Sequence, residues 1–295
     1  MTVSVVTDST AYLPPERVGS YGLRVVPLHV RLDAADSRPE TVFTPEELTA
    51  ALESGRRVTT SGATVPEFVR AYRDALSAGA DGVLSVHLSG ELSGTCDAAR
   101  VAAREVDPDR IRVLDSRSVA MGLGFAVLAA AARAAEGAPL PEVAAVAERT
   151  ALRGTVLFSV RTMEYLRRGG RIGAGAALLG TALAVRPLLR VRDGLIEATE
   201  KVRTTGRAVS RLEELAVGAF PDRAASEPVA LAVHHLAAPR RAEALARSVL
   251  ARVPDCSDCV ISEVGPTVGA HTGPGTVGVV VLPGGWGAPD SDAAS

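Results

Sequence analysis

The sequence predicts an α/β protein of two domains, the first built on a parallel sheet and the second on a mixed sheet with hairpins. The chain has 295 residues, about the length of two domains, and its 47% hydrophobic and 22% charged content is typical of globular proteins. Residues 2–152 alternate short β-branched runs with helical stretches, as the crossover units of a parallel sheet do. After residue 153 hairpins and helices mix, which favours an α+β organisation there.

The first predicted domain spans residues 1–153. We expect strands at 3–6, 23–30, 83–88 and 111–114, and helices at 45–53, 66–77, 95–105, 119–135 and about 140–153. Prolines stand at plausible first positions of the helices at 45 and 66. Gly137, Pro139 and Pro141 interrupt the pattern before the last helix.

The longest apolar stretch, 119–132, lies between Arg117 and Arg133. As a helix it would rise about 21 Å, short of the roughly 30 Å hydrocarbon core of a bilayer, so we predict a buried core helix. The first apolar stretch contains Asp8 and follows no basic segment, unlike a signal peptide. Three cysteines are too few for a disulfide framework and fit a reducing compartment. We therefore expect a cytoplasmic protein that does not span a membrane.

The second predicted domain spans residues 154–283. We expect strands at 156–160, 229–234, 260–264 and 276–282, and helices at 204–219 and 238–251. The strands at 185–192 and 196–203 should form a hairpin, because Asp193-Gly194 between them is a strong two-residue turn signal. Residues 284–295 are rich in Gly, Pro, Asp and Ser, so we expect a disordered tail.

Composition excludes some classes of partner. The 32 Lys and Arg against 34 Asp and Glu leave a net charge of -2, so no overall field favours nucleic acid. Aromatic residues make up 3% of the chain, so any large pocket must be lined by aliphatic side chains.

Small polar loops follow three expected strands, at 7–10, 89–95 and 115–118, and a fourth, at 59–62, follows the short run Arg57-Val58. Loops at the carboxyl ends of parallel strands meet at one edge of a sheet, where ligands bind. Ser93 and Gly94 also precede an expected helix, whose N-terminus favours an anion. The alternative is that these hydroxyl groups only cap helices. Four such loops together favour one binding crevice.

Two glycine-rich segments of the second half add candidate binding residues. In 164–173 three arginines and paired glycines interrupt helical periodicity, and we expect Arg171, between Gly170 and Ile172, to turn inward. Residues 265–275 contain too many glycines for a regular element, so we expect a rigid loop. His271 with the neighbouring hydroxyl of Thr272 could donate hydrogen bonds to an oxyanion there.

Other chemistries lack their defining residues. Ser93 and His271 remain as a hydrolase alternative, although 90–94 is not a G-x-S-x-G elbow. No phosphate loop of the form G-x-x-x-x-G-K-[ST] is present, and no dinucleotide motif G-x-G-x-x-G follows the first strand. Cys256 and Cys259 have the spacing of a zinc-binding pair, but the chain lacks the second ligand pair that a structural zinc normally needs. The adjacent histidines at 234–235 point to opposite faces of a strand, so they are a poor chelating pair. We therefore expect no metal site and no cofactor.

Taken in order, the polar segments resemble the DegV family of bacterial fatty-acid-binding proteins, which includes the lipid-carrying subunit of fatty acid kinase. The resemblance is nearly full length and runs through Val6-Thr-Asp-Ser-Thr10, Thr60-Ser61, Leu92-Ser-Gly-Thr95, Asp115-Ser-Arg-Ser-Val-Ala-Met-Gly-Leu-Gly124, Glu164-Tyr-Leu-Arg-Arg-Gly-Gly-Arg-Ile172 and Gly269-Ala-His-Thr-Gly-Pro-Gly275. One departure is Gly62-Ala-Thr-Val65, where the family commonly has Gln-Pro-Ser or Gln-Pro-Thr.

The resemblance implies an N-terminal Rossmann-like domain, a C-terminal α/β domain and one long-chain fatty acid held between them. It implies that Thr60 or Ser61 and Ser93 bond the carboxylate, with Arg171 and His271 completing the polar site. Together with Gly94 and Thr272, which the residue pattern indicates, these form the expected ligand-binding set. The resemblance further implies that a separate ATP-dependent kinase subunit phosphorylates the bound acid for phospholipid synthesis, and that Arg203 docks this subunit. The chain itself would then be no enzyme. A lipid carrier or sensor without phosphorylation is the alternative.

The energetics favour a binding protein. Burying an acyl chain of about fourteen methylenes at roughly 0.8 kcal/mol each yields about 11 kcal/mol gross. The apolar tunnel should therefore dominate affinity, with the helix at 119–135 forming part of its wall, while the polar site orients the carboxylate.

Overall fold

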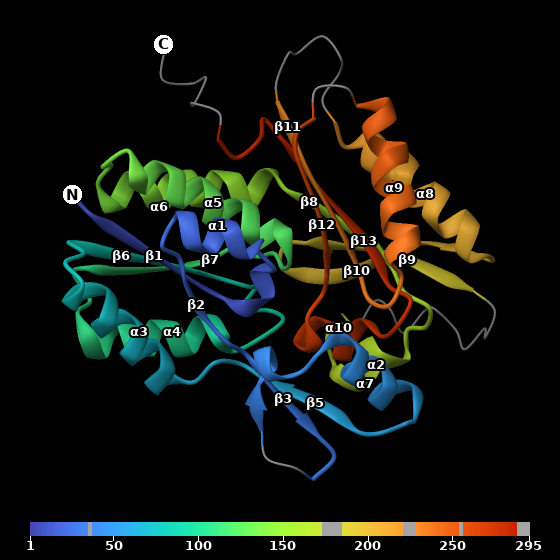
Figure 1. Cartoon of the computed structure of the whole chain (residues 1–295), viewed down its shortest axis with the longest axis horizontal. Coiled ribbons are helices and arrows are strands. Elements are labelled where there is room, and N and C mark those ends of the chain that lie inside the picture. Colours follow the sequence, from blue (N-terminus) through green and yellow to red (C-terminus); the bar gives the residue numbers. More distant parts are fainter. Residues whose placement is uncertain (35–36, 173–184, 221–227, 254–255, 288–295) are drawn as a thin grey trace.

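A computed structural model describes residues 1–34, 37–172, 185–220, 228–253 and 256–287 of the chain. Figure 1 shows two large sheets side by side, with a small third sheet below them. Among the described residues, strands of the first large sheet all precede residue 116 and those of the second all follow residue 154. The two-domain α/β prediction is thus confirmed at the level of the sheets. We propose 1–153 and 154–283 as the domains.

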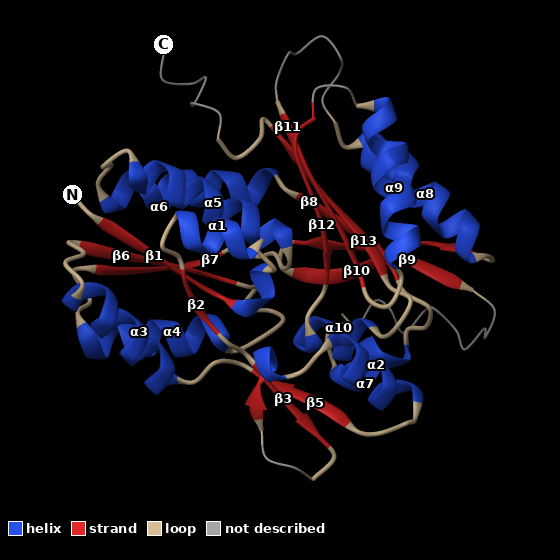
Figure 2. Ribbon diagram, viewed as in Figure 1, coloured by secondary structure: helices blue, strands red, loops and turns tan. Residues whose placement is uncertain are grey.

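The N-terminal sheet is parallel, as predicted. Its strands, in spatial order, are β2 (Arg24–Val26), β1 (Val3–Asp8), β6 (Gly82–His87) and β7 (Ile111–Asp115). Helices α3 (Val65–Ser77) and α4 (Thr95–Val106) cover one face, while α5 (Met121–Ala135) and α6 (Leu140–Arg153) cover the other (Figure 2). Every residue of β6 is buried, because the strand has helices above and below it.

We predicted one strand at 23–30, but the structure has two strands there, and they belong to different sheets. After β2, Pro27 lacks an N–H group to continue the ladder, and the chain turns into β3 (His29–Leu32). The small antiparallel sheet has the order β4 (Arg38–Pro39), β3, β5 (Val58–Ser61), and α2 (Pro45–Glu53) lies beside it. The segment 59–61, which we expected as a loop at the edge of the parallel sheet, is therefore part of a strand in a separate sheet.

The C-terminal sheet is mixed, and its helices also follow the prediction. The spatial order is β10 (Leu195–Val202), β9 (Arg186–Arg192), β8 (Thr155–Ser159), β13 (Val277–Pro283), β11 (Val229–His235), β12 (Cys256–Glu263), with only β11 and β12 parallel among these described strands. Helices α8 (Thr205–Gly218) and α9 (Pro239–Arg252) cover one face (Figure 1). The predicted turn is present, with Asp193 at φ 52° and Gly194 at φ 84°.

Helix α5 joins the two sheets. Leu123 and Val127 pack into the core of the first domain, while Phe125 and Leu128 pack against the strands of the second. All residues from 121 to 131 are buried, which confirms the predicted core helix. In the described part of the chain, no helix is long and apolar enough to cross a bilayer.

The glycine-rich run 265–275 contains a helix, so the prediction of a loop is wrong. This helix, α10 (Pro266–Thr272), lies against α2 and the short helix α7 (Glu164–Gly169) (Figure 1). A Cβ on Gly269 would lie 2.5 Å from a methyl of Leu48, so glycine permits the close approach of α2.

The predicted disordered tail starts too early. Trp286 is placed, and its indole N–H donates to Asp258 at 2.7 Å while the Arg17 guanidinium lies 5.1 Å from the ring centroid. Residues 288–295 lie outside the described residues.

A fully buried polar network ties β1 to β6. The Asp8 carboxylate accepts hydrogen bonds from Thr10 N at 3.0 Å and Leu88 N at 3.0 Å, and it lies 3.0 Å from His87 Nδ1. His87 Nε2 lies 2.6 Å from Ser85 Oγ. Asp8 therefore satisfies donors from two chain segments that meet at the end of the sheet.

We expect Asp8→Ala to lower the free energy of unfolding by about 3 kcal/mol or more, since it leaves several buried donors without an acceptor. Urea unfolding followed by circular dichroism measures this. Asp97→Ala is the matched control, because Asp97 is exposed and its ion pair with Arg100 lies at the surface. A loss for Asp8→Ala no larger than for the control would contradict a structural role.

Candidate functional site

A cavity lies between the two domains. Its space free of protein atoms, counted together with the part that opens to solvent, is about 880 Å³. Its walls come from the C-terminal sheet, from β5 and α10, and from the segments that lead into α4 and α5.

Most of the cavity wall is aliphatic. The apolar lining consists of Leu28, Leu88, Leu92, Val119, Ala120, Val156, Leu157, Phe158, Leu166, Ile196, Val264, Val268, Val279 and Val280. Phe158 is the one aromatic hydrocarbon ring among these described residues. Such a wall offers dispersion contacts and hydrophobic burial to a flexible apolar ligand.

One part of the wall is polar, and it joins residues that are far apart in the sequence. Thr60 Oγ1, on β5, lies 2.7 Å from His271 Nε2, on α10, across 211 positions of the chain. Ser61 and Thr272 line the same cavity from these two elements. The Thr272 hydroxyl donates to the Val268 carbonyl at 3.2 Å, within its own helix.

Ser93 and Arg171 complete this polar cluster. Arg171 Nε donates to the Leu92 carbonyl at 3.1 Å, and another of its N–H groups donates to the Gly169 carbonyl. Ser93 Oγ lies 2.8 Å from Thr95 Oγ1. We call Thr60, Ser61, Ser93, Arg171 and His271 the head cluster. Arg167 and Arg168 are exposed and Arg171 is not, as predicted.

Two predicted residues lie outside the cavity lining. Gly94 immediately precedes α4 and Arg203 is exposed after β10. Of the four predicted polar segments, those containing Ser61, which belongs to β5, and Ser93 reach the cavity. The loop after β1 holds the Asp8 network instead, and the loop 115–118 ends just before the lining residue Val119.

Residues of the N-terminal domain hold α10, the helix that carries His271. The buried carboxylate of Glu40 accepts the Thr267 N–H at 2.8 Å and also the Ser9 hydroxyl. Tyr12 Oη accepts the Val268 N–H at 3.3 Å. These contacts satisfy free N–H groups in the first turn of α10. Burial raises the pKa of Glu40, because it disfavours the ionised carboxylate.

Neither Glu40 nor Tyr12 stands in a recognisable sequence signal, so the residue pattern alone could not find them.

His234 also lines the cavity, which the sequence pattern did not predict. It accepts the Met121 N–H on Nε2 at 3.2 Å, so Nδ1 carries the proton and donates to Ser262 Oγ at 3.0 Å. Burial is the main cause that lowers the pKa of His234 to about 4.

His271 is a neutral ring near pH 7. Burial, and secondly the positive charge of Arg171, lower its pKa to about 4. Arg171 therefore supplies the positive charge of the head cluster, while His271 and the hydroxyl groups supply neutral hydrogen bonds. This set suits one anionic group at the polar part of an otherwise apolar cavity.

The hydrolase alternative gains no support from these contacts. Ser93 Oγ is paired with Thr95, and His271 Nε2 with Thr60, so serine and histidine do not form a nucleophile and base pair. Ser85, His87 and Asp8 do form a triad-like chain, but all three are fully buried and outside the cavity lining. A substrate cannot reach that network.

Within the described ranges, no group of three His, Cys, Asp or Glu side chains is placed to hold a metal ion. Burial raises the pKa of Cys259 to about 11, so its thiol stays protonated near pH 7. Cys256 is a free thiol as well, and the two do not form a disulfide.

Comparison with known proteins finds a family model and sequence relatives that cover almost the whole chain. Residues 2–284 match the family model described as "Uncharacterised protein, DegV family". A DegV domain-containing protein of Streptomyces coelicolor is 51% identical over 279 residues, covering 95% of this chain and 98% of the relative. A DegV domain-containing protein of Mycobacterium tuberculosis is 42% identical over 282 residues, covering 95% and 97%.

Solved structures are similar over almost the whole chain. A DegV family protein from Thermus thermophilus, described by its fatty acid binding, has a TM-score of 0.89 and 36% identity, covering 96% of this chain and 100% of that one. DegV from Bacillus subtilis, described as a fatty acid binding protein, has a TM-score of 0.85 and 29% identity, covering 96% and 99%.

We expect the unliganded protein to keep His271 neutral down to about pH 4, as its lowered pKa requires. Since this pKa is below the usual 6.5, the unfolded chain binds the proton first as the pH falls. The contribution of His271 to stability is thus complete above pH 6.5 and is lost between 6.5 and about 4.

Titration of the histidine ring signals by NMR measures this pKa, with His271→Gln assigning the signal. A pKa near 6.5 in the unliganded protein would contradict the buried, neutral ring. Anion binding beside His271 should raise the pKa, because a negative charge favours the protonated form.

Proposed function

The chain belongs to the DegV family, and from that premise we propose that it binds one long-chain fatty acid in the cavity between its domains. The carboxylate lies at the head cluster and the acyl chain lies along the aliphatic wall. The protein presents this carboxylate to a separate ATP-dependent fatty acid kinase subunit, whose product feeds phospholipid synthesis.

The single observation that carries the proposal is the distribution of polarity in the cavity. The five residues of the head cluster lie together, whereas the rest of the wall is mostly aliphatic. A fatty acid has the same distribution, with one anionic group on a long hydrocarbon chain. The family relatives from Thermus and Bacillus, described as fatty acid binding, support the same ligand class.

The head cluster retains hydrogen-bond donors for a carboxylate. A guanidinium has five N–H groups, and the contacts of Arg171 with Leu92 and Gly169 occupy one Nε and one Nη donor. The hydroxyls of Thr60, Ser61 and Ser93 can rotate toward a ligand. Arg171 therefore neutralises the carboxylate, and the neutral donors fix its orientation.

Presentation to another protein requires that the head group lie near the surface. Ser61 meets this requirement, because it lines the cavity and is itself exposed. Arg203 is also exposed, which suits the proposed docking of the kinase subunit. Phosphoryl transfer adds negative charge at the head group, and Arg171 is placed to offset it.

We expect the purified protein to carry about one fatty acid per chain, since an apolar cavity of this size favours lipid over water. Mass spectrometry of extracted lipid measures it. Val119→Phe should reduce the bound fatty acid at least tenfold, because the larger side chain enters the cavity from its wall.

Val101→Phe is the matched control, since Val101 is 42% exposed on α4 and far from the lining. It should bind lipid like the unchanged protein. A lipid-free protein that also takes up no added fatty acid would refute the proposed ligand.

We expect Arg171→Ala and His271→Ala each to retain acyl-chain binding, because the aliphatic wall is unchanged. Acyl phosphate formation with a cognate kinase and ATP should fall about 100-fold, the usual effect of losing one donor to a developing charge. Loading each variant with fatty acid and measuring bound lipid and acyl phosphate together separates the two effects.

Arg168→Ala is the control, because Arg168 is exposed and pairs with Glu164 on the same short helix. Normal turnover by both head-cluster variants would make the assignment wrong. Loss of lipid from both would mean that they maintain the fold instead. If the unchanged protein and all of these variants bound lipid but none yielded acyl phosphate, a lipid carrier or sensor without phosphorylation would be favoured.

A further inference from the structure

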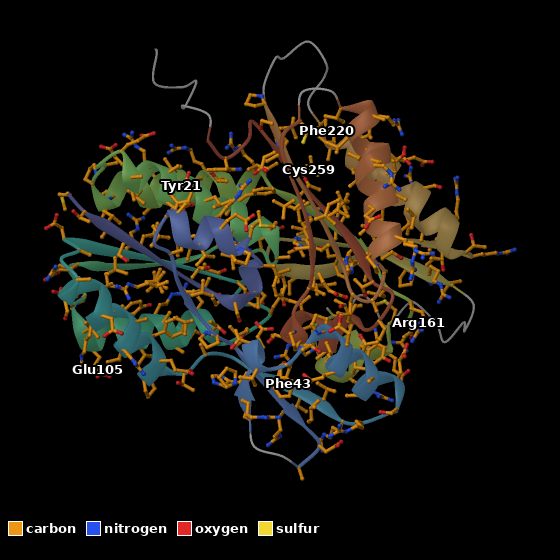
Figure 3. All side chains as sticks on the ribbon, viewed as in Figure 1. Tyr21, Phe43, Glu105, Arg161, Phe220 and Cys259 are labelled. Carbon is orange, nitrogen blue, oxygen red and sulfur yellow. The ribbon has the colours of Figure 1, made fainter. Side chains whose placement is uncertain are left out.

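A second hollow lies in the C-terminal domain, and three arginines from different elements line it. Arg161 follows β8, Arg186 begins β9, and Arg241 lies in the first turn of α9. The hollow has about 340 Å³ free of protein atoms. Figure 3 labels Arg161 on the right of the view. We call this site the arginine hollow; none of its lining residues lines the lipid cavity.

The positive charges in the arginine hollow are poorly compensated. Arg186 donates to the Arg161 carbonyl at 2.5 Å, and Arg241 donates to the Gly275 carbonyl at 3.4 Å, so both face neutral oxygens. Among the described residues, Arg161 is the one arginine of the three with an ion pair, to Glu53 at 3.8 Å at the surface. No acidic side chain is among the described residues that line the hollow.

Other arginines of the same domain are paired closely. An Nη of Arg190 lies 3.0 Å from Glu197, and an Nη of Arg211 lies 2.8 Å from Glu200. Three like charges directed into one hollow repel one another, and an anion between them would remove this repulsion. The hollow therefore has an electrostatic preference for an anionic ligand.

The hollow also contains neutral donors that suit an oxyanion. Thr205 is the first residue of α8, and its Oγ1 accepts a hydrogen bond from Arg186 Nε at 3.4 Å, which leaves its own proton free to donate. Ser159 also lines the hollow. The first turn of α8 contains no acidic residue, so nothing there opposes an anion.

We propose that the arginine hollow binds the phosphate group of a small molecule. Guanidinium groups that approach from three elements suit a tetrahedral anion with three or four oxygens better than a flat carboxylate with two. Gly275 lies in the loop between α10 and β13 and accepts a hydrogen bond from Arg241, so phosphate bound by Arg161 and Arg241 would lie beside the segment that leads from His271 to β13. The site itself does not require bound lipid or a kinase.

The test is calorimetric titration of the purified full chain with inorganic phosphate, at an ionic strength held constant with KCl. We expect saturable binding that Arg186→Gln and Arg241→Gln each weaken at least tenfold. Arg247→Gln is the matched control on α9, since Arg247 is largely exposed and its partner Glu243 lies 4.0 Å away. The control should bind phosphate normally.

Parallel titrations with glycerol 3-phosphate and ATP distinguish the sources of the phosphate group. Whichever of inorganic phosphate, glycerol 3-phosphate and ATP has the lowest dissociation constant identifies the class of compound. Arg161→Gln keeps the test valid if the inner variants fail to fold, because its side chain is about half exposed and its loss should also weaken binding. The proposal would be overturned if Arg161→Gln bound phosphate as tightly as the unchanged protein does. It would also be overturned if titration with phosphate produced no more heat than titration with KCl. Lipid content measured on the same samples tests the proposed function separately.

Discussion

Helix α5 must be buried on every side, and the arrangement of the two domains depends on this constraint. Its residues from 121 to 131 have no exposed face, so the helix needs an apolar partner on both sides. The first sheet provides one through Leu123 and Val127, and the second provides the other through Phe125 and Leu128. His234 of the second sheet accepts the Met121 N–H, so the same contact satisfies the polar start of the helix.

The cavity lies where the C-terminal sheet meets the start of α5. Val119 and Ala120, just before the helix, form part of its wall, and residues of β8, β11 and β13 form another part. The polar part of that space depends on a second interdomain contact, in which Glu40 and Tyr12 hold the first turn of α10. Because these residues fix α10, they position His271 without touching the head cluster themselves.

Histidine serves three different purposes in this protein, and burial distinguishes them. His87 completes a closed polar network that joins two strands, so its resemblance to a catalytic triad has no chemical consequence. His234 caps a helix as a neutral ring. His271 is neutral too, but it lies at the border of the cavity beside the permanent charge of Arg171. Only His271 combines access to the cavity with an adjacent cation.

The sequence by itself determined the alternation of strands and helices, the buried helix α5, the turn at Asp193-Gly194 and the inward direction of Arg171, because local periodicity and glycine placement encode backbone and burial. Only the tertiary structure decided that Thr60 meets His271 and that a glycine-rich run forms α10. These outcomes depend on contacts between residues up to 256 positions apart, such as Val268 with Tyr12. No local pattern specifies such contacts, since they form only when both domains close around the same core.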